Sequence, residues 1–352
     1  MLYNTDDLRI TGMQEVLPPI QLHQELPITD NASKTVFEAR NIAQKIVHGD
    51  DDRLLIIIGP CSIHDPDAAR DYASRLKPLI DELKDELHII MRVYFEKPRS
   101  VVGWKGLIND PHLDGSFNIN DGLHFARKLL LDLAEMGVPA GSEYLDLISP
   151  QYIADLISWG AIGARTTESQ AHRELASGLS CPVGFKNATD GGLQIAVDAC
   201  MSASNPHHFM SLTKAGHSAI FSTTGNPDCH VILRGGKQPN YDATSIQQTA
   251  ETIGRTGQKA LFMVDCSHAN SGKNHIQQEI VCRDVANQIS HGEKRIMGLM
   301  LESNLVAGRQ NTDTGKPLVY GQSITDACMA WDNSEVLLRE LADAVRHRRL
   351  EV

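Results

Sequence analysis

Residues 54–65 read LLIIIGPCSIHD, and this stretch introduces a pattern that recurs along the chain. Five aliphatic residues, three of them β-branched, run up to Gly59 and are typical of a buried strand. Asp65 followed by Pro66 then predicts the start of a helix, because aspartate caps free amides and proline fits the first turn. A strand this apolar, followed directly by a helix, is typical of a parallel sheet covered on its outer face.

Further apolar runs follow, separated by segments with helical spacing. They are His88–Val93, Val138–Glu143, Ile162–Thr166, Pro182–Lys186, Val231–Arg234, Leu261–Asp265 and Ile296–Glu302. Together with Leu54–Gly59 they predict an α/β fold of the (β/α)8 TIM-barrel type over residues 51–352. An open doubly wound sheet is less favoured, because no GxGxxG motif follows the first strand.

Two segments do not fit this alternation. Residues 1–50 form a predicted N-terminal extension, with a helix over Ala32–His48 that ends at Gly49. Residues 205–224 contain two short strand-like runs, Phe209–Thr213 and Ser218–Thr223, and predict a β-hairpin inserted before strand six.

Composition limits the classes of function. The chain has 352 residues and a formal net charge of −11, which argues against nucleic acid as the main partner. The apolar runs are strand-sized, so neither a membrane span nor a signal peptide is expected. The seven cysteines are an odd number and contain no CxxC pair, which favours a reducing cytoplasm over a disulfide framework.

The predicted strands all end in polar or ionisable side chains. In strand order these are Cys61, Arg92, Glu143, Arg165, Lys186, Arg234, His268 and Glu302. Single strands often end this way at a protein surface. Because the catalytic groups of a barrel lie at the carboxyl ends of its strands, the whole series predicts an active site at that mouth.

Three of these residues have metal-binding chemistry. Cys61, His268 and Glu302 offer a thiolate, an imidazole and a carboxylate, and Asp326 beyond the last strand is a fourth candidate. Such ligands admit one divalent ion, which could be manganese, iron, cobalt or zinc. No local spacing motif supports the set, and His64 competes as a ligand, although the helix starting beside it favours a structural role.

Four of the other five residues in the series are cations, and the fifth is Glu143. Arg92, Arg165, Lys186 and Arg234 are joined by a basic stretch that contains Lys97, Arg99 and Lys105. Scattered surface ion pairs are the ordinary explanation. Seven convergent cations would instead suit two anionic substrates, at least one of which carries phosphate and carboxylate together. A metal beside two such anions suggests carbon–carbon bond formation, with no Schiff base required of Lys186.

Eight motifs carry a closer resemblance. They are GPCSIHD (59–65), RVYFEKPR (92–99), GWKGLINDP (103–111), GARTTES (163–169), PVGFKN (182–187), ILRGGK (232–237), DCSHAN (265–270), and ES (302–303) followed by SITDAC (323–328). The chain closely resembles, over essentially its whole length, the bacterial type I, aromatic-amino-acid-regulated class of 3-deoxy-D-arabino-heptulosonate 7-phosphate (DAHP) synthases. The resemblance implies that phosphoenolpyruvate condenses with erythrose 4-phosphate to give DAHP and phosphate, the first step of the shikimate pathway.

The resemblance also implies roles for single residues. Cys61, His268, Glu302 and Asp326 would bind the metal, which would polarise the aldehyde oxygen for attack by the enol carbon. Phosphoenolpyruvate would be held by Arg92, Lys105, Arg165, Lys186 and Arg234. The sugar phosphate would be held by Lys97, Arg99 and Ser100, where the family often has threonine at the last position.

The extension and the hairpin resemble the regulatory elements of that family, in which an aromatic amino acid binds between subunits of a homo-oligomer, a dimer or a tetramer. The matching positions are Asp6, Asp7, Pro150, Gln151, Leu179, Ser180, Phe209, Ser211 and Phe221. A serine at position 211 resembles the phenylalanine-sensitive group, whereas Phe221 is larger than the side chain expected there.

Two rival functions differ in class. One is a synthase of the eight-carbon analogue that uses arabinose 5-phosphate, and the KPRS stretch (97–100) and the long extension argue against it. The other is a phosphoenolpyruvate or amino-acid sensor on an inactive barrel, which the intact metal set argues against. Cys328 is also expected near Cys61, where oxidation could join the two thiols.

Overall fold

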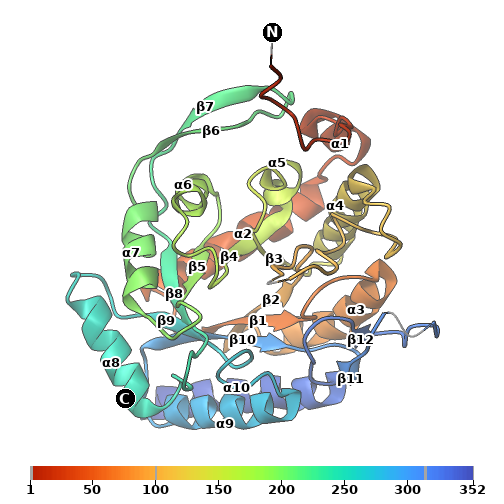
Figure 1. Ribbon diagram of the computed structural model, residues 1–352. Coiled ribbons are helices and arrows are strands. Elements are labelled where there is room, and N and C mark those ends of the chain that lie inside the picture. The colour runs from red at the N-terminus through yellow and green to blue at the C-terminus, as the bar shows by residue number, and fades with distance from the viewer. Residues whose placement is uncertain (1–2, 100, 313–314, 352) are drawn as a thin grey trace.

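The computed structural model describes residues 3–99, 101–312 and 315–351, and within them eight parallel strands close into a barrel (Figure 1). Around the barrel the order is β1-β10-β9-β8-β5-β4-β3-β2, so each strand lies beside its neighbour in the predicted series. This arrangement confirms the (β/α)8 barrel. The barrel strands are β1 (Leu54–Gly59), β2 (Leu87–Arg92), β3 (Ala140–Glu143), β4 (Ile157–Ile162), β5 (Val183–Lys186), β8 (Cys229–Leu233), β9 (Phe262–Asp265) and β10 (Ile296–Glu302).

Helices cover the outer face of the barrel. They are α3 (Pro66–Glu82), α4 (Ile119–Glu135), α5 (Pro150–Ile153) with the 3-10 turn η1 (Ala154–Leu156), α6 (Gln170–Gly178), α7 (Gln194–Ala203), α8 (Ala243–Gly254), α9 (His275–Ser290) and α10 (Trp331–Leu350). The side chain of Asp65 accepts hydrogen bonds from the amides of Asp67 and Ala68, which confirms the predicted cap of α3. Two short strands, β11 (Val306–Arg309) and β12 (Gln322–Ser323), pair beyond β10.

The position predicted for the fourth strand, Ile162–Thr166, is wrong. The strand occupies Ile157–Ile162, and Gly163 begins a turn in which its carbonyl accepts hydrogen bonds from the amides of Thr166 and Thr167. The run ISWGAI does not stand out in the sequence, because Ser158 and Gly160 interrupt its apolar character. Arg165 therefore lies on the turn after the strand and not at the strand end.

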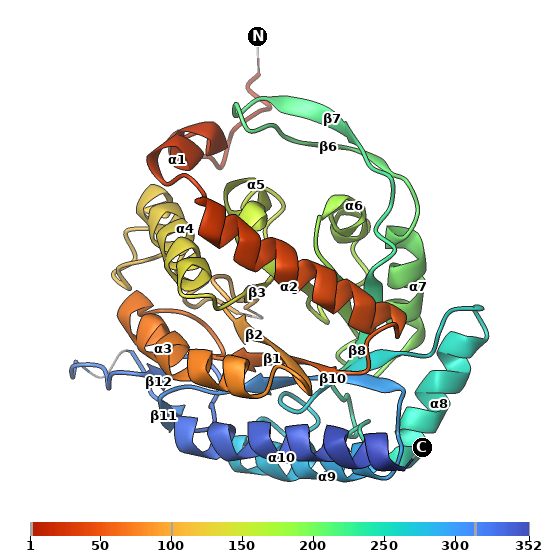
Figure 2. The ribbon, with the colours of Figure 1, turned by 180° about the vertical axis from the view of Figure 1, so that it is seen from behind.

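Apolar side chains fill the amino-terminal half of the barrel. Leu55, Ile57, Ile90, Trp159 and Met263 form a buried cluster there, against which the helix α2 (Asp30–His48) places further apolar side chains. Figure 2 shows α2 lying across this end of the barrel. Because that end is packed and covered, the polar side chains of the barrel gather at the opposite, carboxyl-terminal mouth.

The inserted hairpin forms as predicted. Strands β6 (His208–Leu212) and β7 (Ser218–Ser222) pair in antiparallel register, and the helix α1 (Pro19–Glu25) lies beside their connecting turn (Figure 1). The amide of Ile20 donates to the carbonyl of Lys214 over 2.7 Å. The outer face of the hairpin shows Met210, 85% exposed, and Ile220, 77% exposed. In the described part of the chain, we find no helix with the length and apolar character to cross a bilayer.

Candidate active site

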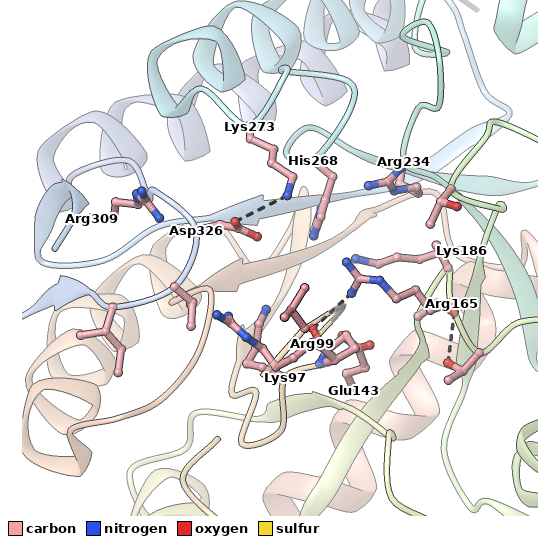
Figure 3. Close-up of a pocket in the computed structure, with 18 of the residues that line it drawn as sticks. Lys97, Arg99, Glu143, Arg165, Lys186, Arg234, His268, Lys273, Arg309 and Asp326 are labelled. Atoms are coloured by element: carbon pink, nitrogen blue, oxygen red, sulfur yellow. Dashed lines mark hydrogen bonds and ion pairs between the residues drawn. The ribbon is translucent and has the colours of Figure 1, made fainter. Parts of the chain in front are cut away.

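A cavity of about 400 Å³ opens at the carboxyl-terminal mouth of the barrel (Figure 3). Its lining is dominated by cationic side chains that come from different strands and loops. They are Lys97, Arg99, Arg165, Lys186, Arg234, Lys273 and Arg309, beside Glu143, His268 and Asp326. In a chain with a net charge of −11, this concentration of positive charge makes the mouth a binding site for anions.

The candidate metal centre lies at one side of this mouth. One ligand atom each from Cys61, Glu302 and Asp326 lie within 4.8 Å of one another. Nε2 of His268 is 3.8 Å from Oε1 of Glu302, so the imidazole borders the group. Burial raises the pKa of the Cys61 thiol, and the Glu302 carboxylate raises it further. A bound divalent cation would favour the thiolate, so this set of sulfur, oxygen and nitrogen donors fits such an ion.

A buried carboxylate orients the histidine. Oδ2 of Asp265 is 2.8 Å from Nδ1 of His268, which leaves Nε2 on the side of Glu302. Burial alone would raise the pKa of Asp265, but His268 and Lys186 outweigh it and hold the pKa well below its ordinary range. His268 has a φ of 56°, a left-handed conformation that costs a non-glycine residue energy and is often found at functional sites.

Arg92 contacts two residues of the candidate metal centre. Its guanidinium is fully buried, donates to Oε1 of Glu302 over 3.0 Å and lies 3.5 Å above the Tyr94 ring. It also donates to the carbonyls of Pro60 and Cys61. Arg92 does not line the cavity. Its contacts are instead with the Glu302 side chain and the Cys61 carbonyl, in two of the candidate ligand residues.

Lys97 and Lys186 are buried cations that line the cavity itself. Nζ of Lys97 lies 3.2 Å from Sγ of Cys61, and Nζ of Lys186 lies 3.0 Å from Oδ2 of Asp265. Both lysines line the cavity, so each ammonium group lies between a buried partner and the open mouth.

The outer cations are less fixed by the protein. Arg99 and Arg165 are exposed, and Nη1 of Arg165 donates to the carbonyl of Pro98 over 3.2 Å. The amide of Arg234 donates to Oδ1 of the buried Asn187, which holds the backbone beside the Gly235 turn. Lys105 is exposed and does not line the cavity, and Ser100 lies outside the described residues.

Three of the predicted effector positions, Phe209, Ser211 and Phe221, lie on the hairpin. The rings of Phe209 and Phe221 are 6.1 Å apart, and Ser211 points to the same half-buried face of the hairpin. The ammonium group of Lys214 donates to the carbonyl of Gln151. Pro150 is buried and Leu179 is half-buried, whereas Asp6, Asp7 and Ser180 are exposed.

Several residues of the site escaped prediction. Asp265 and Gln278 are buried next to the candidate metal ligands. Lys273, in the loop after β9, and Arg309, at the end of β11, line the mouth. Asp265 ends an apolar strand and begins the DCSHAN motif, which could have drawn attention to it. No signal of that kind precedes Gln278, Lys273 or Arg309.

Comparison with known proteins agrees with this geometry. The family model described as the DAHP synthetase I family matches residues 25–339. The chain belongs to this family. Its reaction is accordingly the family's condensation of phosphoenolpyruvate with erythrose 4-phosphate, and its barrel mouth is the place where the polar groups for such chemistry meet.

Close relatives within the family cover the chain almost completely. A phospho-2-dehydro-3-deoxyheptonate aldolase of Escherichia coli K12, named Phe-sensitive, is 61% identical over 99% of this chain and 100% of its own. A Trp-sensitive aldolase of Enterobacter agglomerans is 52% identical over 98% of this chain and 99% of its own. A solved structure of the aldolase from Francisella tularensis SCHU S4 superposes with a TM-score of 0.95 at 51% identity, covering 97% of this chain and 99% of the other.

Proposed function

We propose that this chain carries out the condensation at the barrel mouth with one divalent metal ion held by Cys61, His268, Glu302 and Asp326. The observation that supports this most is the close approach of Cys61, Glu302 and Asp326, within 4.8 Å of one another, beside the imidazole of His268. When bound, the ion would supply Lewis-acid polarisation of the aldehyde oxygen of erythrose 4-phosphate. Manganese, iron, cobalt and zinc all suit this donor set.

The cations divide between the two substrates. Lys186, Arg234 and Arg165 lie on the side of the mouth away from Asp326 and suit the carboxylate and phosphate of phosphoenolpyruvate (Figure 3). Lys97 and Arg99 lie at the facing side and suit the phosphate of the sugar, with Ser100 next in sequence. Arg92 and Lys105 complete the phosphoenolpyruvate set by family resemblance, Arg92 from its buried position and Lys105 from the adjacent loop.

These side chains would lower the barrier by orientation and by charge. Two phosphorylated anions repel each other, and the ring of cations offsets that repulsion while the enol carbon faces the aldehyde. Water then enters and inorganic phosphate leaves as an anion, which the same arginines stabilise. Because Lys97 and Lys186 are buried and held by Cys61 and Asp265, these two cations need little reorganisation when charge develops.

The metal assignment is tested with Cys61→Ala. The variant should keep its fold but bind less manganese, as measured by equilibrium dialysis, and should release little phosphate from the two substrates. Cys229→Ala, at the far start of β8, is the matched control and should behave as wild type. Full turnover by Cys61→Ala would exclude this cysteine as a ligand.

We further propose that phenylalanine is the feedback inhibitor. The support is the Phe-sensitive name of the 61% identical relative, together with Ser211 on the half-buried face of the hairpin. The pocket would be formed by Asp6, Asp7, Pro150, Gln151, Leu179, Ser180, Phe209, Ser211 and Phe221. Ser211→Gly should weaken inhibition by phenylalanine while leaving the uninhibited rate unchanged. Ser218→Gly, on the exposed face of the same hairpin, is the control, and equal sensitivity of all three proteins would exclude this pocket.

The regulatory elements suit an oligomer, either a dimer or a tetramer. Residues 1–50 and the hairpin 205–224 expose apolar side chains such as Met210, Ile220 and Met13, which a second copy would cover. Light scattering on the intact protein should give a mass of two or four chains, and Met210→Glu should lower it. The free thiols of Cys61 and six other cysteines suit a reducing cytoplasm.

A further inference from the structure

A second cavity lies at the amino-terminal end of the barrel, opposite the catalytic mouth. Its volume is about 520 Å³, and it is bounded by the end of α2, the loop before β1, the starts of β9 and β10, and the end of α10. In Figure 2 these segments meet at the edge of the face that α2 crosses. Nothing in the reaction described above uses this space.

One wall of the cavity is apolar. Ile46, Leu261 and Met297 line it, and they belong to or pack against the cluster that fills this end of the barrel. Leu261 is only partly buried, so part of its aliphatic surface faces the cavity. Covering such a surface with an apolar group removes it from water and is favourable.

The rim of the cavity is strongly cationic. Three of its arginines have carboxylate partners: Arg53 pairs with Asp51, Arg295 with Glu293 and Arg349 with Asp52. Three further cations, Lys259, Lys294 and Arg348, have no carboxylate within 4.0 Å in the described part of the chain, although the chain carries a net charge of −11. The rim therefore keeps positive charge that the protein itself does not neutralise.

Arg348 is the least accessible of these cations. Its side chain is only 6% exposed, and its one hydrogen bond with the described residues is from Nη2 to the carbonyl oxygen of Asp52. Burial lowers the pKa of Arg348, although the residue remains charged. A guanidinium carries five N–H donors, and Arg348 uses one of them within the described residues, while the Asp52 carboxylate offsets part of its charge.

We propose that this cavity binds a small organic anion, with its negative head on Arg348 and Lys294 and its apolar body against Leu261 and Met297. A carboxylate or sulfonate on an aromatic or aliphatic body has this chemistry. The two sugar and enol phosphates of the catalytic reaction lack the apolar part, so the site is distinct from the mouth in its choice of ligand as well as in its location.

The test uses a fluorescent probe that matches this description. The probe, 8-anilinonaphthalene-1-sulfonate, has an aromatic body and one anionic head, and N-phenyl-1-naphthylamine is the same body without the sulfonate. The intact wild-type protein should bind one sulfonate probe per chain at this cavity, more tightly than the neutral analogue. Saturating phosphoenolpyruvate with manganese should not displace it.

Variants locate the binding. Lys294→Glu and Arg348→Gln should each lower the affinity for the sulfonate probe by about tenfold, the size expected for one charge-assisted contact. Arg346→Gln is the matched control, because this arginine lies on the same helix, pairs with Glu86 and does not line the cavity. Lys294 is exposed, so its variant keeps the test valid if Arg348→Gln fails to fold. Unchanged binding in Lys294→Glu, displacement by phosphoenolpyruvate, or equal affinity for the neutral analogue would each overturn the proposal.

Discussion

Oδ2 of Asp265 lies 2.8 Å from Nδ1 of His268 and 3.0 Å from Nζ of Lys186. One fully buried carboxylate oxygen thus contacts both a candidate metal ligand and a candidate substrate cation. Ser267 donates its hydroxyl and its amide to the other oxygen, Oδ1, which fixes the carboxylate plane. The proposed metal side and the proposed phosphoenolpyruvate side of the site are therefore joined through Asp265.

Asp265→Asn should weaken both sides at once. The neutral side-chain amide of asparagine cannot balance the charge of Lys186. It can also turn its NH₂ group toward Nδ1 of His268 and so disturb the tautomer of that imidazole. We expect metal affinity to fall by about 10–100-fold, as is typical when a group that orients a metal ligand is lost. Equilibrium dialysis with manganese measures it, and Asp284→Asn on the surface of α9 is the control. Wild-type affinity in Asp265→Asn would contradict this role.

Gln278→Leu should displace Glu302. The buried Gln278 side chain accepts a hydrogen bond from the Glu302 amide over 2.7 Å and donates to its carbonyl over 3.0 Å. Leucine leaves that amide unpaired, which costs about 1–3 kcal/mol of unfolding free energy. Denaturant unfolding should show this loss together with weaker metal binding, whereas Gln277→Leu should leave metal binding intact. A stable variant with normal metal affinity would show that Glu302 is held in other ways.

Much of this architecture could be predicted from local pattern. The run of Leu54–Gly59 and the cap at Asp65 identify a strand and a helix without tertiary information, and the ionisable side chains at strand ends indicate the mouth. The bounds Ile157–Ile162 of the fourth strand cannot be read from local pattern, because its burial comes from the barrel and not from an unbroken aliphatic run. Gln278 could not be predicted, since its role depends on the packing of α9 against β10. The family resemblance places Arg92 among the substrate-binding cations, whereas its contact with Glu302 arises only when β2 and β10 pair with β1 in the closed barrel.

Glu96 should make stability depend on pH. Burial raises the pKa of this carboxyl to about 7, with a further contribution from Asp146. Because the folded pKa is above the ordinary value of 4.5, the folded state binds more protons than the unfolded state between these values. The free energy of unfolding should therefore fall as the pH rises from about 4.5 to beyond 7, by up to about 3 kcal/mol.

Glu96→Gln should remove that part of the pH dependence. Glutamine can still accept the hydrogen bond that the Ser149 hydroxyl now donates to Oε2 of Glu96 over 3.0 Å. Denaturant unfolding at pH 5.5 and pH 8.5 measures the effect. The free energy of unfolding of the variant should exceed that of the wild type only at the higher pH. An equal change in the free energy of unfolding between the two pH values for both proteins would show that Glu96 does not titrate in this range.

Oxidation of the metal-free protein should abolish the activity that manganese otherwise restores. The amide of Cys61 lies 3.4 Å from Sγ of Cys328, and both thiols are buried and free. We expect mild oxidant to remove two titratable thiols together with activity, and bound manganese to protect both. Cys328→Ala should keep its activity under the same treatment, whereas Cys200→Ala should be inactivated like wild type. Thiol loss without loss of activity would rule out this pair.

The central claim is that one divalent ion and a ring of cations act together at the barrel mouth, and phosphate release tests it most directly. Chelated protein given phosphoenolpyruvate and erythrose 4-phosphate should release almost no phosphate, and added manganese should restore release only when both substrates are present. Release at the full rate from the metal-free protein, or from phosphoenolpyruvate without the aldehyde, would contradict it.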